Sequence, residues 1–338
     1  MPVQAQPTHF NTSFITMHPL RLLADIGGTN IRLAWQEAPG GALQDTRVLQ
    51  CAQYPGVEAA IQSYLREVGV PTPREAAFGM ANPVTGDTVR MTNHSWSFSQ
   101  QALREAFGWQ RLVVINDFTA LALALPQLTP DLLRQVGGGA AVPGAAIALV
   151  GPGTGLGVSG LVFPPGASAG VPLSGEGGHV SLAAQTQLEF DVLGILQERY
   201  GHVSAERAVS GPGLVDLYHA VRKLAQRAGE EVSSAAQVTE LALQAQDPLA
   251  LQALDLFCGF LGSVAGNLAL TLGARGGVYL GGGMVPRLGS WFEQSSFRSR
   301  FEAKGRFQPY LAAIPCWVID PGATPALYGA SRALDIAG

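Results

Sequence analysis

The sequence predicts an α/β protein with layered sheets, built from two halves that open in the same way. Short apolar runs bounded by glycine alternate with longer segments whose apolar residues recur at helical spacing, as in sheets covered by helices. A length of 338 residues suggests two domains at about 150 residues each. A strand, a Gly-Thr turn and a second strand occur at 20–36 and again at 146–163, which indicates a duplicated architecture.

The composition is that of a folded chain with a large core. Charged residues make up 14% of the chain, against about 25% in an average soluble domain, while hydrophobic residues reach 47%. Intrinsic disorder is therefore excluded. A formal net charge of −4 provides no attraction to nucleic acid or an anionic membrane, so we expect neither as a partner. The three cysteines are far apart without CxxC spacing, which indicates neither a disulfide framework nor a zinc site.

Two uncharged stretches have about the length that crosses a bilayer. The stretch 145–163 contains Pro152 and several glycines, so it cannot form one regular helix. The stretch 257–274 has a helical pattern, but Ser263, Asn267 and Thr271 form a polar stripe, which favours a buried helix of a soluble protein. The N-terminus has neither the basic start nor the apolar run of a signal peptide. We therefore expect a cytoplasmic protein.

In the first half, the expected elements follow a leader. Residues 1–19 have no periodicity and predict a flexible leader. The runs 20–26 and 31–36 predict a hairpin that turns at Gly27-Gly28, and 46–51 predicts a third strand. Further along, the patterns predict a helix at 57–68, a strand at 76–80, a helix at 99–107, a strand at 112–116 and a helix that begins near Asp117.

The second half repeats this opening with the hairpin predicted at 146–163. Setting Thr29 against Thr154 aligns Gly28 with Gly153, so the two turns correspond. Later segments are mostly helical in pattern. Helices are predicted at 186–200, 213–227, 234–246 and 248–272, and a last strand at 277–280.

Three glycine-rich loops follow predicted strands. Bare backbone N–H groups can converge on phosphate where no Cβ intervenes. One such loop is more often a structural turn, but three of them, two with Thr, favour nucleotide binding. A Walker A motif is excluded because the only lysines, Lys223 and Lys304, do not follow glycine. The loops are Asp25-Ile26-Gly27-Gly28-Thr29-Asn30, Gly151 to Gly155, and Gly281-Gly282-Gly283.

Two motif matches point to other chemistry and are discounted. Gly155, Gly157 and Gly160 fit the dinucleotide-binding spacing, with Glu176 at a suitable distance, but a strand follows where that fingerprint requires a helix. The segment 166–170 fits a nucleophile elbow, yet it lies in a loop rich in proline and glycine with no helix after it.

Polar groups in apolar or glycine-dense settings are the candidate site residues. Asn116 and Asp117 lie at a predicted strand-to-helix junction, where a helix cap is the alternative role of Asp117. Glu176 and His179 lie on a glycine-rich backbone that suits gripping a small ligand, although a solvated surface turn is the alternative. Glu206 is followed by an arginine, so a surface ion pair is its alternative. Together these groups can hydrogen-bond a polyhydroxylated substrate.

Eight motifs then occur in order over about residues 20–336. They are DIGGTNIRLA at 25–34, NDFTA at 116–120, GTGLG at 153–157, GEGGHV at 175–180, SAER at 204–207, SGPGL at 210–214, GGGMVPR at 281–287 and KGRF at 304–307. This set closely resembles the bacterial glucokinases of the hexokinase/actin-like ATPase superfamily. The chain departs from the pattern at Ala24, where glycine is common, and in its leader.

The resemblance implies a two-lobed actin-like ATPase fold, which is ribonuclease H-like, with a duplicated βββαβαβα core. The small lobe is expected at 20–127 plus the C-terminal segment 322–338, and the large lobe at 128–321. The active site is expected in the cleft between the lobes. Homodimers are usual in the family, and a sugar and a nucleotide are the expected small-molecule partners.

The resemblance also implies transfer of the ATP γ-phosphoryl group to the 6-hydroxyl of D-glucose, giving glucose 6-phosphate and ADP. A kinase for another hexose, or a non-catalytic sugar sensor on the same fold, is the alternative. Asp117 is the expected general base, and Asp25 is expected near Mg²⁺ through water. Sugar-binding residues are expected at Asn116, Asp117, Glu176, His179 and Glu206, and nucleotide-binding residues at Asp25, Ile26, Gly27, Gly28, Thr29, Asn30, Gly153, Thr154, Gly155, Gly281, Gly282 and Gly283.

Overall fold

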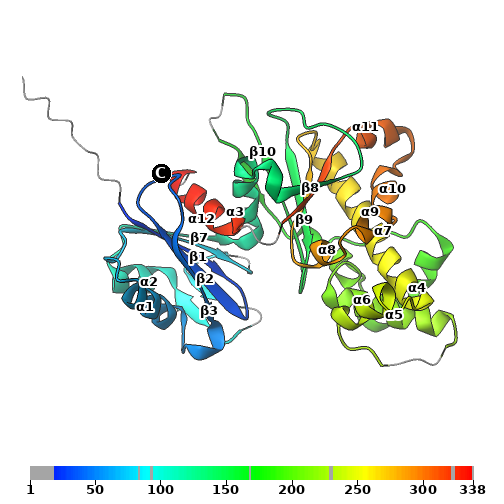
Figure 1. Ribbon diagram of the computed structural model, residues 1–338, viewed down its shortest axis with the longest axis horizontal. Coiled ribbons are helices and arrows are strands. Elements are labelled where there is room, and N and C mark those ends of the chain that lie inside the picture. The colour runs from blue at the N-terminus through cyan, green and yellow to red at the C-terminus, as the bar shows by residue number, and fades with distance from the viewer. Residues whose placement is uncertain are drawn as a thin grey trace, which may run out of the picture.

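The computed structural model is a mixed α/β protein with two large sheets (Figure 1). We call the regions around them the five-stranded part and the six-stranded part. The leader expected at 1–19 lies, except for its last residue, outside the described residues. The structure describes residues 19–82, 84–91, 94–166, 169–227, 231–320 and 324–336.

The five-stranded sheet has the order β3-β2-β1-β4-β7. Its first three strands are antiparallel, and β4 and β7 continue in parallel from β1. Both faces of β1 and β4 are buried, as expected for central strands covered by helices. The predicted hairpin and the two later strands are confirmed. The strands are β1 (Arg21–Ile26), β2 (Asn30–Gln36), β3 (Gln44–Gln50), β4 (Glu75–Met80) and β7 (Arg111–Asn116).

Helices cover both faces of this sheet. Leu22 and Ala24 of β1 point to the face with α1 and α2, whereas Leu23 between them packs under α12. Helix α1 ends at Gly69, whose φ of 67° is in the left-handed region, as the glycine signal predicted. The helices of this part are α1 (Val57–Val68), α2 (Gln100–Phe107), α3 (Asp117–Ala124) and α12 (Pro325–Ile336), and a small ribbon pairs β5 (Thr88–Arg90) with β6 (Ser97–Ser99).

The six-stranded sheet has the order β11-β10-β9-β12-β13-β8. Here too three antiparallel strands, β9 to β11, are followed by parallel ones, because β12 pairs in parallel with β9 and β13 with β12, and β8 adds an antiparallel edge strand. The predicted strands β9, β10 and β12 are confirmed, and β10 continues as a strand where a dinucleotide fold would need a helix. The strands are β8 (Leu133–Val136), β9 (Ile147–Pro152), β10 (Leu156–Val162), β11 (Val171–Ser174), β12 (Val278–Leu280) and β13 (Cys316–Ile319).

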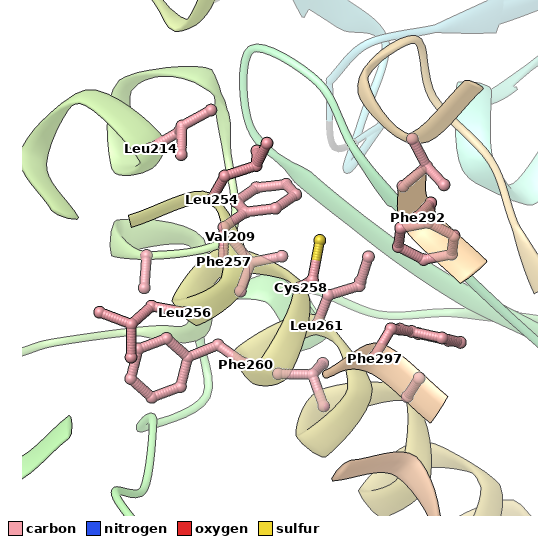
Figure 2. Packing of buried hydrophobic residues seen from close by; sticks show 14 of the residues in the cluster. Val209, Leu214, Leu254, Leu256, Phe257, Cys258, Phe260, Leu261, Phe292 and Phe297 are labelled. Carbon is pink, nitrogen blue, oxygen red and sulfur yellow. The ribbon is translucent and has the colours of Figure 1, made fainter. Parts of the chain in front are cut away.

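The helices of the six-stranded part pack around α7. Phe257 and Phe260 of α7 belong to the apolar cluster of Figure 2, which Phe292 and Phe297 enter from the neighbouring short helices. All four predicted helices are confirmed within a few residues. The helices are α4 (Gln187–Tyr200), α5 (Gly211–Leu224), α6 (Ala235–Leu243), α7 (Pro248–Leu272), α8 (Met284–Arg287), α9 (Trp291–Gln294), α10 (Phe297–Glu302) and α11 (Gln308–Ala312).

Helix α7 is long and apolar enough to cross a membrane by length and composition. However, 78% of its most apolar window is buried inside the structure. A Cβ added at Gly262 would lie 2.2 Å from the carbonyl oxygen of Phe297, so α10 packs directly against the bare backbone of α7. These contacts place α7 in the core, as its polar stripe predicted.

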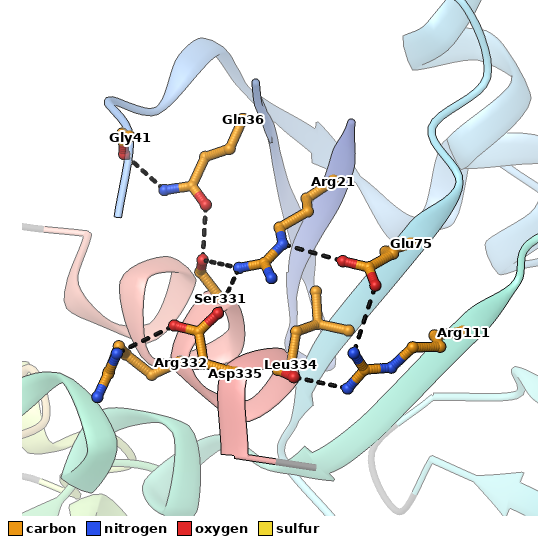
Figure 3. A network of polar contacts seen from close by, with 9 residues as sticks. All are labelled: Arg21, Gln36, Gly41, Glu75, Arg111, Ser331, Arg332, Leu334 and Asp335. Atoms are coloured by element: carbon orange, nitrogen blue, oxygen red, sulfur yellow. Dashed lines mark hydrogen bonds and ion pairs between the residues drawn. The ribbon is translucent and has the colours of Figure 1, made fainter. Parts of the chain in front are cut away.

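The chain returns to the five-stranded sheet at its C-terminal end, where α12 is fastened by a polar network (Figure 3). The Arg21 guanidinium binds Glu75 at 3.1 Å and Asp335 of α12 at 2.7 Å. Ser331 donates a hydrogen bond of 2.6 Å to Gln36, and Arg111 also contacts Glu75. Charged groups this buried are tolerated because each has a partner.

An apolar cluster joins the two parts, and we call it the joining cluster. Its members come from α3 and α12 on one side and from β9, β10, β12 and β13 on the other. Helix α3 therefore lies between the two sheets. The buried members of the joining cluster are Ala122, Leu123, Leu125, Ile147, Leu149, Leu161, Tyr279, Ile319 and Ala333.

Candidate functional site

The junction between β7 and α3 presents Asn116 and Asp117. The Asn116 side chain caps the helix, because its Oδ1 accepts hydrogen bonds from the backbone N–H groups of Phe118 at 2.9 Å and Thr119 at 3.2 Å. Asp117 is the first helical residue, and its Oδ1 also accepts from the Phe118 N–H at 2.9 Å. The alternative that Asp117 is the cap is therefore wrong, and its carboxylate requires another explanation.

The pKa of Asp117 shows that two other predicted site residues, Asp25 and Glu176, lie near enough to act on it. Burial raises the pKa of Asp117 to about 7, and the negative charges of Asp25 and Glu176 raise it in the same direction. Burial also raises the pKa of Asp25, although Arg32 opposes this through an ion pair of 3.0 Å. A carboxyl that titrates near neutrality can accept a proton during a reaction.

The first glycine-rich loop turns between β1 and β2. The Gly27 N–H donates to the Asn30 carbonyl at 2.9 Å, and the Cys51 N–H donates to the Thr29 carbonyl at 2.9 Å, so the turn is fixed from two sides. A cavity of about 280 Å³ opens beside it. The cavity is lined by Asp25, Gly27, Gly28, Thr29, Asn30, Arg32 and Val48.

The second loop turns between β9 and β10 and is bonded to Glu206. The Gly153 N–H donates to the Gly155 carbonyl at 2.8 Å, which closes the turn. Glu206 Oε2 accepts a hydrogen bond of 2.9 Å from the Leu156 N–H. A Cβ added at Gly155 would lie 2.5 Å from that same oxygen, so a larger residue there would displace the Glu206 carboxylate. The neighbouring Arg207 guanidinium lies 4.0 Å from the Tyr200 ring centre. Glu206 thus binds Leu156 and Arg207 packs on Tyr200, so the alternative of an ion pair between Glu206 and Arg207 is wrong.

The third loop, after β12, lies against the second. The Gly281 N–H donates to the Val150 carbonyl at 2.9 Å. Gly282 has a φ of +75°, and a Cβ there would lie 2.4 Å from the carbonyl oxygen of Pro152. The two loops of the six-stranded part therefore form one glycine-lined surface.

Glu176 precedes a short 3₁₀ turn, Gly177–His179, which ends with His179 and lies on β10. A Cβ added at Gly178 would lie 2.2 Å from the Leu156 carbonyl oxygen, so only bare backbone can approach the strand this closely. The Ala205 N–H donates to the Val180 carbonyl at 2.8 Å, which places the Glu206 turn next to this one. Both Glu176 and His179 are exposed.

Arg32 is a site residue that the sequence prediction missed. In the β1–β2 register Arg32 is the direct partner of Asp25. A hairpin with its turn at 27–29 sets those two positions opposite each other, so the predicted hairpin contained the signal. Among the described residues, no group of three or more His, Cys, Asp or Glu side chains could hold a metal ion alone.

The solved structures that resemble this chain are those of sugar kinases. The crystal structure of glucokinase from an Antarctic psychrotroph superimposes with a TM-score of 0.85 at 35% identity, covering 94% of this chain and 99% of that one. A ROK family glucokinase from Streptomyces griseus, solved in complex with glucose and AMPPNP, has the same fold with a TM-score of 0.62. It is 19% identical, over 93% of this chain and 98% of that chain.

The chain belongs to the glucokinase family. The family model described as Glucokinase matches residues 22–336. The protein named Glucokinase from Aromatoleum aromaticum is 55% identical over 316 residues, which cover 93% of this chain and 94% of that protein. The sequence resemblance to bacterial glucokinases is thus confirmed.

Proposed function

We propose that this chain is an ATP-dependent glucokinase that transfers the γ-phosphoryl group of ATP to the 6-hydroxyl of glucose. The products are glucose 6-phosphate and ADP. Family membership supports this reaction, and the observation that carries it is the buried Asp117 carboxylate, with its pKa of about 7, at a helix start between two sets of glycine-rich loops. Phosphoryl transfer depends mainly on positioning and electrostatics, which such a site can supply.

Asp117 is the proposed general base. Its ionised form would accept the proton of the 6-hydroxyl as the oxygen attacks phosphorus, and the 2.9 Å bond from the Phe118 N–H holds the carboxylate in place. Burial, together with the charges of Asp25 and Glu176, raises the pKa of this carboxyl and makes it a better proton acceptor than an ordinary aspartate.

The sugar would be held from both parts of the molecule. Asn116 and Asp117 lie at the junction of β7 and α3, whereas Glu176, His179 and Glu206 lie on turns beside β10. Carboxylates and an imidazole can accept or donate hydrogen bonds to ring hydroxyls. Because Glu206 is anchored through the Leu156 N–H, its carboxylate is already oriented before sugar arrives.

The nucleotide phosphates would lie against the glycine-rich loops. The Gly28 N–H would approach a phosphate oxygen, with the Thr29 and Thr154 hydroxyls as further donors, while the N–H groups of Gly27 and Gly153 keep the loops closed through their bonds to Asn30 and Gly155. The 281–283 loop would bind on the adenosine side. Mg²⁺ suits this donor set, because it is usually held by one or two carboxylates, water and substrate phosphates, and Asp25 supplies a carboxylate at the loop. Bound Mg²⁺ would neutralise phosphate charge.

The architecture would then consist of two lobes with a duplicated βββαβαβα core and the site in the cleft between them. The matching strand orders of the two sheets support the duplication. We propose a small lobe at 20–127 plus 322–338 and a large lobe at 128–321, with α12 fastened to the small lobe by the Arg21 network. A cytoplasmic homodimer is the proposed state of the protein.

A coupled assay of ADP formation tests the function. Purified chain with Mg²⁺ is assayed over a panel of hexoses and of phosphoryl donors. Glucose with ATP should give the highest kcat/KM. A higher kcat/KM with another hexose would show that glucose is not the preferred substrate. If the chain binds glucose tightly but no sugar gives ADP formation, it is a sugar sensor.

A further inference from the structure

The ring of Phe118, on α3, lies on bare backbone of the six-stranded part. Gly151 of β9 and Gly157 of β10 face each other as direct strand partners. A Cβ added at Gly157 would lie 2.1 Å from Cε2 of the ring, and one at Gly151 would lie 2.7 Å from Cζ. Only glycine leaves room for the ring at either position. We call this pair the glycine slot.

The glycine slot borders the loops proposed to bind the nucleotide. Gly151 and Gly157 each stand two residues from the turn Gly153 to Gly155. The ring also approaches the third loop, because a Cβ added at Gly281 would lie 3.8 Å from Cε1 of Phe118. One side chain therefore contacts the backbone next to both loops of the six-stranded part.

The backbone of the same residue holds the proposed proton acceptor. The Phe118 N–H donates to Oδ1 of Asn116 and to Oδ1 of Asp117, each at 2.9 Å. Movement of Phe118 away from the glycine slot would therefore change the positions of both side chains relative to the nucleotide loops.

Helix α3 packs closely against the five-stranded part, so the position of Phe118 determines how far that part lies from the glycine slot. Its carbonyl at Ala120 would lie 1.7 Å from a Cβ added at Gly329 of α12. A Cβ added at Gly79 of β4 would lie 3.3 Å from Cβ of Ala120. With α3 packed against both β4 and α12, the Phe118 ring fixes its separation from β9 and β10.

We propose that Phe118 is a positioning residue, whose ring in the glycine slot sets the distance between Asp117 and the nucleotide loops. This inference rests on the proposed kinase function. A displacement of about 1 Å between reacting groups can lower a rate about 100-fold. Loss of the ring should therefore lower kcat much more than it weakens glucose binding, since Glu176, His179 and Glu206 lie elsewhere.

The first test compares Phe118→Ala and Phe118→Leu with Leu123→Ala. Leu123 is on the same helix and in the same joining cluster but packs at the far end from the glycine slot. We expect kcat to fall about 100-fold in Phe118→Ala, with a much smaller change in the KM for glucose. Leu123→Ala should lower thermal stability with little change in kcat. If Phe118→Ala does not fold, the same comparison of kcat and KM is made with Phe118→Leu, which also lacks the ring and should also lose kcat more than it changes the KM.

The second test is a double-mutant cycle with Gly157→Ala. The added Cβ would displace the ring, so this variant should lose kcat by itself. In Phe118→Ala the same change should cost little more, because the clash is gone. Provided that the wild type is active, two results would overturn the inference. One is that the losses of kcat from Phe118→Ala and Gly157→Ala multiply as independent effects, and the other is that kcat of the Phe118 variants falls no further than that of Leu123→Ala. A wild type without glucose-dependent ADP formation would overturn the proposed function itself.

Discussion

Asp117 is the residue whose environment departs furthest from the ordinary state of its side chain among the proposed site residues. It lies at the start of α3 with its carboxylate largely buried, and two further carboxylates, Asp25 and Glu176, act on it. A buried charge is costly unless it is compensated. Because Asn116 already caps α3, the buried Asp117 carboxylate is not needed for the helix, which favours a role in the reaction.

Replacing Asp117 by Asn should lower kcat by about 10²- to 10⁴-fold, because the proton acceptor is lost while the shape is kept. Glucose affinity should change much less, since four other proposed side chains remain. Steady-state kinetics and a glucose titration by intrinsic fluorescence measure the two quantities. Asp131→Asn, at an exposed position, is the matched control. Turnover near the wild-type value in Asp117→Asn would refute the role of base.

The pH dependence follows from the same group. Since the pKa of Asp117 is raised to about 7, kcat/KM should fall as pH decreases through that value. The folded-state pKa lies above the unfolded value of 3.8, so the protonated carboxyl favours folding, and this contribution is lost as pH rises towards 7. The stability advantage of Asp117→Asn over wild type should therefore grow between about pH 4 and 7 and level off above. A thermal unfolding series at several pH values measures it, and a constant difference would contradict the raised pKa.

At the scale of single residues, the sequence predicts the strand-to-helix junction at Asn116 and Asp117 but not which of the two caps the helix. Asn116 is the cap, and the sequence alone does not distinguish them because both residue types cap helices. The bond from Leu156 to Glu206 joins residues 50 positions apart, and no local pattern contains it.

At the scale of elements, the network that fastens α12 is a buried one. Glu75 is 7% exposed and binds both Arg21 and Arg111. Glu75→Gln should destabilise the fold by about 3 to 5 kcal/mol, because it leaves buried guanidinium charge without its partner. Urea unfolding measures this. The control Glu67→Gln breaks the exposed ion pair with Arg47 and should cost less than about 1 kcal/mol. Equal effects of both variants would show that the network contributes no more than a surface pair.

The crossing of α12 and α3 gives a second prediction at this scale. Gly329→Ala would place a Cβ 1.7 Å from the Ala120 carbonyl oxygen, so the helices must separate. We expect a lower melting temperature and, since α3 carries Asp117, a lower kcat. Gly194→Ala, on exposed helix α4 with no atom within 4 Å of the new Cβ, should be neutral or stabilise by up to about 1 kcal/mol. A Gly329→Ala variant as stable and active as Gly194→Ala would refute the close crossing.

The sequence predicts long helices closely, because their apolar spacing repeats over several turns, but it does not predict the short ones. Helices α1 and α7 have the predicted bounds because their apolar spacing is sustained and their ends carry glycine or proline. The segment 284–312 folds into helices of four to six residues, which are too short to show a period. Strand β13 exists through its pairing with β12 and β8, which local sequence does not contain.

At the scale of the whole molecule, the position of the site follows from the topology more than from any one motif. The candidate site residues are spread from residue 25 to residue 283, and the packing of α3 between the two sheets sets the part that carries the first loop against the part that carries the other two. The paired hairpins could be predicted because both repeat one pattern. The joining cluster could not, since it draws on six elements of both parts.

Glucose should therefore draw the two parts together, because its proposed ligands lie on both. Asn116 and Asp117 are at the start of α3, on the five-stranded part, while Glu206 is beside β10, and one sugar can bridge them only if the separation is small. Small-angle scattering should show that saturating glucose decreases the radius of gyration, whereas the open-chain polyol sorbitol should leave it unchanged.

Glu206→Gln should weaken glucose binding about 10- to 100-fold, since a charge-assisted hydrogen bond is lost, and the decrease in the radius of gyration should then require a higher glucose concentration. Asp117→Asn should close as wild type does, because the chemistry and not the bridge is removed. Tight glucose binding with an unchanged radius of gyration would contradict a site shared between the two parts.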